Sequence, residues 1–161
     1  METITKSASG KGVINTDVLL NQWLGHRNIT RRVIEVYPDD KIFTYSIGGM
    51  RTFAELIREI LTMGAPGIRG VVEGKWEGFQ QIHAAYQFTS KQEILDYWDA
   101  STEEIKSLWP QIKPERFHET DKFFGQWEGQ IHWSIFYTID NEIHHRAQAY
   151  VYLRSLGMLI G

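Results

Sequence analysis

The sequence predicts an all-α protein: a four-helix bundle with a long connection before its last helix. Four stretches carry apolar residues at helical spacing. Two of these open with capping boxes, Thr52-Phe-Ala-Glu55 and Ser90-Lys-Gln-Glu93, and no convincing set of alternating strands competes with them. A chain of 161 residues suits one domain with its own core, so we expect residues 13–161 to form it and residues 1–12 to be a flexible tail.

The first two helices are expected at about 15–36 and from Phe53 onward. Tyr37-Pro38 should end the first helix, because proline cannot continue it. The second follows the Thr52 capping box. Gly64-Ala-Pro66-Gly67 should kink or interrupt it, so that a continuation to Glu73 is expected only beyond that break.

The third helix should begin after Ser90 and end near Pro110. Between residues 113 and 129 the chain is charged and aromatic with two glycines, which indicates a long connection with room for a short hairpin. The last helix is expected over Gln130–Leu156, with Gly157 as its left-handed stop.

Composition excludes several classes of function. The chain has no cysteine, so thiolate nucleophiles, iron–sulfur clusters and cysteine zinc sites are ruled out. The formal charge of −3 and the lack of a basic run argue against nucleic acid as a partner. The N-terminus lacks the apolar core of a secretory signal, and charges interrupt every apolar stretch, so we expect a cytoplasmic protein without membrane contact.

The last helix carries an unusually polar stripe. Its members recur at helical spacing and are Ser134, Thr138, Asn141, His145, Gln148 and Tyr152. If this stripe faces the bundle interior, its groups need hydrogen-bond partners or a metal ion. Spacing alone does not decide between a metal ligand and a hydrogen-bonded histidine at His145, because the amide of Asn141 is a weak ligand. His144 points about 100° away, which indicates a surface residue, and Glu142 is expected to pair with Arg146.

Two segments of the chain resemble the DinB-like, or YfiT-like, superfamily. His144-His145-Arg146-Ala147-Gln148, followed by Tyr152-Leu153-Arg154-Ser155-Leu156-Gly157, is similar to the fourth-helix signature H-x-x-x-H-R-G-Q of that family. Arg51-Thr52-Phe53-Ala54-Glu55-Leu56 is similar to the start of its second helix. The resemblance implies a four-helix bundle that often dimerises and holds a divalent metal with three histidines.

Carried onto this chain, the resemblance implies an altered metal site. Its ligands would be Glu59, Asn141 and His145, because Glu59 and Asn141 stand where the family has its other two histidines. A carboxylate and an imidazole suit Zn, Ni, Fe or Mn, while the amide weakens the site and leaves positions for water. His26 is an alternative third ligand or a hydrogen-bonded histidine. Without a metal, Glu59 could pair with protonated His145.

Two functions remain open at this point. The resemblance implies a metal-dependent thiol transferase or hydrolase that acts on a small electrophile, with a low-molecular-weight thiol as cosubstrate. Thr138, Gln148 or Tyr152 would orient substrate or water. The alternative is a non-catalytic homodimer with a degenerate metal site that binds a small ligand or has a structural role. Aromatic residues at helical spacing are more often core than pocket, so none of the tryptophans is given a chemical role.

Overall fold

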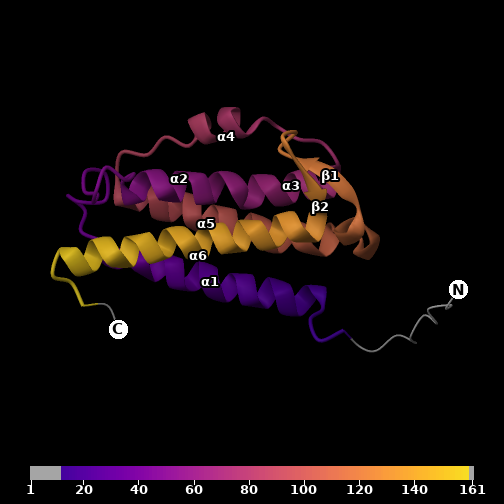
Figure 1. The fold of residues 1–161 in the computed structure, drawn as a ribbon, viewed down its shortest axis with the longest axis horizontal. Helices are drawn as coiled ribbons and strands as arrows, with labels where there is room; N and C mark the ends of the chain where they lie inside the picture. The colour runs from indigo at the N-terminus through magenta and orange to yellow at the C-terminus, as the bar shows by residue number, and fades with distance from the viewer. Residues whose placement is uncertain (1–11, 160–161) are drawn as a thin grey trace, which may run out of the picture.

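Four rods of helix pack side by side along most of the molecule (Figure 1). The computed structural model describes residues 12–159. The rods are Thr16–Val36 (α1), Phe53–Met63 continued by Ala65–Glu73 (α2 and α3), Lys91–Leu108 (α5) and Ile131–Ser155 (α6). The predicted all-α four-helix bundle is therefore confirmed. The predicted tail, residues 1–12, lies outside the described residues except for Gly12.

Capping side chains set the starts of three rods. Asn15 accepts a hydrogen bond from the backbone N–H of Val18 at 2.9 Å. Thr52 and Ser90 each close a complete capping box with the glutamate three residues later, as predicted. These bonds satisfy backbone N–H groups that have no partner within the first turn of a helix. Local sequence therefore fixes where the rods begin.

The second rod is broken between α2 and α3, as the sequence predicts. Gly64 has ψ −102°, which no helical residue adopts, and Pro66 lies in the first turn of α3. Proline is tolerated there because its missing N–H would have no helical partner. The two helices stay nearly in line (Figure 1), so the break changes the phase of the rod more than its direction.

Gly70 of α3 lies directly under the ring of Trp76. A Cβ atom at Gly70 would come within 2.2 Å of Trp76 Cε3, well inside van der Waals contact. We expect Gly70→Ala to lower the free energy of unfolding by about 1–3 kcal/mol through overpacking. The matched control is Gly25→Ala in α1, where no atom lies within 4 Å and alanine should stabilise the helix by about 1 kcal/mol. Urea denaturation of both variants measures the difference, and a harmless Gly70→Ala would contradict this packing.

The long connection before the last rod contains a short hairpin. After two 3₁₀ turns, Trp109–Gln111 and Pro114–His118, strand β1 (Thr120–Phe123) pairs antiparallel with β2 (Trp127–Gln130). Gly125 in the turn has φ 71°, a conformation that glycine adopts without strain. Strand β2 runs straight into α6, so the hairpin fixes where the last helix begins.

One helix is absent from the sequence-based prediction. Helix α4 (Phe79–Ala85) runs over the outside of α2, as the top of Figure 1 shows. It has only seven residues, no side-chain cap and one buried side chain, Ile82. So short a helix has little signal of its own, and its packing on α2 is what defines it.

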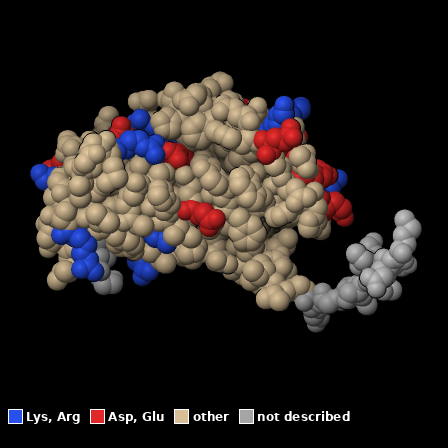
Figure 2. All heavy atoms as spheres, viewed as in Figure 1, with Lys and Arg blue, Asp and Glu red and all other residues tan. Residues whose placement is uncertain are grey.

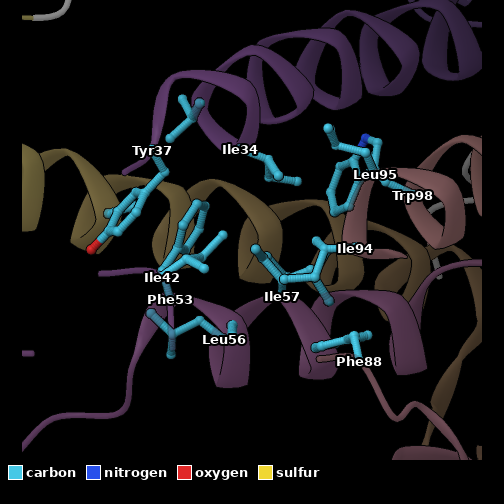
Figure 3. Packing of buried hydrophobic residues seen from close by; sticks show 14 of the residues in the cluster. Ile34, Tyr37, Ile42, Phe53, Leu56, Ile57, Phe88, Ile94, Leu95 and Trp98 are labelled. Carbon is cyan, nitrogen blue, oxygen red and sulfur yellow. The ribbon is translucent and has the colours of Figure 1, made fainter. Parts of the chain in front are cut away.

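The core has two parts along the bundle. Figure 3 shows the first, where Ile34, Phe53, Ile57 and Trp98 from three rods meet with no exposed surface or almost none. The second lies toward the hairpin and contains five buried aromatic rings, those of Trp23, Trp109, Phe117, Phe123 and Phe124. Burial of these side chains is the main source of the stability that holds polar groups in fixed positions on α2 and α6.

The surface carries charges of both signs without a large field of either. On the face shown in Figure 2, charged side chains are sparse over the middle of the bundle and lie mainly toward its ends. Within residues 12–159, no helix combines the length and the apolar character that a membrane crossing requires.

Candidate functional site

The polar stripe of α6 faces the interior, a possibility that the sequence left open. Ser134, Thr138, His145 and Tyr152 are all buried. Phe136, an aromatic residue on the same helix, is 39% exposed. Helix α6 is therefore oriented with polar side chains toward the bundle. Each of these buried polar groups needs a hydrogen-bond partner.

Glu59, Asn141 and His145 come together in a small triangle between α2 and α6. Glu59 Oε1 lies 3.0 Å from His145 Nε2. The amide Nδ2 of Asn141 lies 2.9 Å from Glu59 Oε1 and 3.2 Å from His145 Nε2. The carboxylate is mostly enclosed, with 20% of its side chain exposed. The three positions that the sequence analysis singled out thus meet at one point.

Gln148 sets the orientation of the His145 ring. His145 Nδ1 lies 2.7 Å from Gln148 Oε1, so the proton on Nδ1 is donated to that oxygen. In a neutral ring the lone pair of Nε2 then faces the carboxylate of Glu59. Two electron-rich atoms 3.0 Å apart repel unless a cation lies between them. The geometry therefore requires either a proton on Nε2 or a metal ion.

Arg51 completes the surroundings of Glu59. Its Nη1 donates to Glu59 Oε2 at 2.5 Å, on the carboxylate oxygen that His145 does not contact. Tyr152 donates its hydroxyl proton to the backbone carbonyl of Arg51 at 2.8 Å and so holds this residue in place. The hydrogen bond from His145 is the main reason that the pKa of Glu59 lies well below its usual range; Asn141 and Arg51 lower it further, against partial burial.

Two of the three residues expected to orient substrate or water make hydrogen bonds that support the triangle. Gln148 contacts His145, and Tyr152 anchors Arg51. The third, Thr138, donates its hydroxyl proton to the backbone carbonyl of Ser134 at 2.9 Å, a bond within α6. Gln148 thus holds His145 directly, and Tyr152 acts on Glu59 through Arg51.

The triangle has the dimensions of a metal site. Nitrogen and oxygen ligands at 2.0–2.1 Å from a tetrahedral ion are about 3.3 Å apart, close to the 2.9–3.2 Å found here. Asn141 Oδ1 is buried without a hydrogen-bond partner. A half-turn about the Cβ–Cγ bond would exchange it with Nδ2 and bring an oxygen to the triangle. The three side chains therefore fit a divalent ion.

Asn141 is essential to this fit. Within residues 12–159, no three histidine, aspartate or glutamate side chains lie close enough to hold an ion. His26, the alternative ligand, is engaged elsewhere: its Nδ1 lies 3.2 Å from Arg146 Nη2. His144 is exposed, as predicted. Any ion at this point would thus be held by one carboxylate, one imidazole and one amide oxygen.

The predicted helix pair between Glu142 and Arg146 is wrong. Glu142 is fully buried and accepts hydrogen bonds from Trp23 Nε1 at 3.2 Å and Thr30 Oγ1 at 2.7 Å. Its charged partner is the buried Arg27 of α1, whose Nη1 lies 3.6 Å away. Arg146 instead donates to Thr30. Because Glu142 directly follows Asn141 in α6, this ion pair lies next to the triangle, on the side that faces α1.

A cavity of about 570 Å³ opens beside Glu59. Its wall is largely aromatic and is formed by α2, α4, the hairpin and the start of α6. The lining residues are Glu59, Met63, Phe79, Gln80, Phe123, Gln126, Trp127, Glu128, Trp133, Ser134 and Tyr137. No chemical role was expected for Trp127 or Trp133, and both line this cavity. Their closeness in sequence, on either side of the start of α6, is a signal that could have pointed to it.

Fold and site together define a helical bundle with a candidate cation site beside a largely aromatic cavity. The model of the DinB family matches residues 9–159 of the sequence. The chain belongs to the DinB family. This confirms the resemblance found in the second and last helices.

Solved structures share the fold at low sequence identity. A DinB-like protein from Bacillus subtilis is 19% identical, with a TM-score of 0.69 over 88% of this chain and 94% of that one. A DinB-like protein from Bacillus cereus is also 19% identical, with a TM-score of 0.70 over 90% and 95%. A protein of the same family from Exiguobacterium sibiricum is 17% identical, with a TM-score of 0.68 over 93% and 97%. No curated protein matches the sequence.

Proposed function

We propose that this DinB family protein is a divalent-metal-dependent enzyme, a thiol transferase or hydrolase acting on a small electrophile. One observation carries the proposal: Glu59, Asn141 and His145 present a triangle of ligand-sized separations beside an open cavity. When Nδ1 of His145 donates to Gln148, the lone pair of a neutral Nε2 faces the charged Glu59 at 3.0 Å, and a divalent ion between them would stabilise this arrangement. The amide oxygen of Asn141, which is buried without a hydrogen-bond partner, is available as the third metal ligand.

The residues around the triangle would have separate roles in holding the ion. Glu59 and His145 would hold the ion, and Asn141 would add its oxygen after the amide turns. Bound there, a divalent ion would act as a Lewis acid that lowers the pKa of a thiol or water. Gln148 keeps the lone pair of His145 Nε2 pointing inward, and Arg51 holds the second oxygen of Glu59.

The second candidate is a metal-free protein that binds a small ligand without catalysis. The observation in its favour is the amide orientation itself, with Nδ2 of Asn141 donating to Glu59 Oε1. In that state a proton on His145 Nε2 supplies the cation, and the triangle is a hydrogen-bonded ion pair. The homodimer, the cytoplasmic location and the thiol cosubstrate stay predictions under either candidate.

Metal analysis of protein purified without a His-tag separates the two candidates. We expect about one equivalent of metal per chain in the native protein and its loss in both Glu59→Ala and His145→Ala. The control is His144→Ala, which removes an exposed imidazole from the neighbouring position and should keep the metal. Native protein that is metal-free, and whose melting temperature does not change with zinc, nickel, iron or manganese, would overturn the metal-dependent function.

A further inference from the structure

Aromatic rings in two contacting pairs form the walls of the cavity. Trp133 and Tyr137, one turn apart on α6, stack with ring centroids 5.7 Å apart and an angle of 21°. Trp127 and Phe79 meet edge to face at 5.5 Å. Trp127 and Trp133 are 48% and 56% exposed, although burying a tryptophan is strongly favourable. Their exposed faces are free to contact a flat ligand.

The charged groups of this cavity are all negative. Glu59 stands at one part of the lining and Glu128 of β2 at another, and no lysine, arginine or histidine lines it. Arg51, the nearest guanidinium to Glu59, is bonded to that carboxylate and is not among the lining residues. Because the charge of Glu59 is balanced by its partners, an anion entering the cavity would give up water for the carboxylate of Glu128 and for aromatic faces, both of which repel it.

We infer that the cavity binds a small aromatic cation, with its ring between the tryptophans and its ammonium group toward Glu128. Aromatic faces attract organic cations, and a carboxylate within reach adds a charge-assisted hydrogen bond. A volume of about 570 Å³ suits a ligand of one or two rings. The inference rests on the proposed function in that it takes this cavity to be the substrate site; it names the class of substrate as aromatic and cationic, and excludes anions.

Three probes that share a naphthalene ring system and differ in charge test the inference. They are 1-naphthylmethylammonium, 1-naphthalenemethanol and 1-naphthoate, titrated against native protein before and after metal removal with a chelator. Isothermal calorimetry gives the affinities, and quenching of tryptophan fluorescence reports the contact. We expect the cation to bind most tightly, the alcohol less tightly, and the carboxylate about tenfold or more weaker than the cation, a step of about 1.4 kcal/mol.

Variants show whether the probes occupy this cavity. Trp133→Ala and Trp127→Ala should each weaken the cation about tenfold, the usual scale for loss of an aromatic contact. Glu128→Gln should remove the preference for the cation over the alcohol while leaving the alcohol unchanged. Phe136→Ala removes an aromatic ring that is 39% exposed on α6 but not part of the lining, and should leave all three probes unaffected.

The result of the probe titrations can be judged separately from the result of the metal analysis. Carboxylate binding as tight as cation binding, no binding of any probe, or binding unchanged in both tryptophan variants would overturn it. Metal that is retained while the probes fail would leave the proposed function standing and remove only the substrate class. Probe binding by native protein that is metal-free as purified, and whose melting temperature does not change with added metal, would support the cavity while overturning the metal-dependent function.

Discussion

Glu142→Ala is expected to lower the free energy of unfolding by about 3–5 kcal/mol, because it leaves a buried arginine without its counter-charge. Arg27 is 1% exposed, and burial lowers its pKa by making its charge costly. Its guanidinium stacks on Trp98 at 4.0 Å and donates to Thr102 at 2.7 Å, so it cannot turn to solvent without breaking these contacts. Trp23 would lose its acceptor as well. Urea denaturation followed by tryptophan fluorescence measures the loss.

Two further variants separate the causes of that loss. Glu142→Gln keeps an oxygen that can accept from Thr30 but removes the charge, and should cost less than alanine. Glu103→Ala removes a carboxylate that is 71% exposed and paired with Lys106 on the surface of α5. Such pairs contribute at most about 1 kcal/mol. If Glu142→Ala is no more harmful than Glu103→Ala, the buried pair does not stabilise the bundle as described.

Features set by neighbouring residues were the predictable part of this fold. Capping boxes at Thr52 and Ser90, the break at Pro66 and the stop at Gly157 depend on side chains and backbone within a few positions. Helix α4 was not predicted, because its packing on α2, rather than its local sequence, defines it. The bundle class followed from four local patterns added together.

The site could be predicted only where a family pattern supplied long-range information. Glu59 and His145 are 86 positions apart, and no local rule joins them; the resemblance to the DinB family did. Glu142 shows the limit of spacing rules. The i+4 pattern favours Arg146 as its partner, but the rotation of α6 turns both residues inward, where Arg27 from another helix is closer to the carboxylate. Nothing in the sequence specifies that rotation before the core is packed.

Asn141→His is expected to tighten zinc binding on the order of 100-fold, about 2.7 kcal/mol. An imidazole is a far better zinc ligand than an amide oxygen. The terminal amide atom of Asn141 already lies 2.9 Å from Glu59 Oε1 and 3.2 Å from His145 Nε2. A histidine ring nitrogen bonded to Cγ occupies nearly the same position as that atom. The third ligand would therefore replace a weak donor without moving the other two.

Competition against a chelating dye measures the zinc affinities of native and variant protein. Val151→His is the matched control, because it adds an imidazole at an exposed position of α6 that has no histidine three or four residues away. It should leave the affinity at the native value. The gain in Asn141→His should vanish when His145→Ala is added, since both imidazoles would hold the same ion. An Asn141→His protein that binds zinc no better than Val151→His would show that the triangle does not have metal-site geometry and is a hydrogen-bonded ion pair.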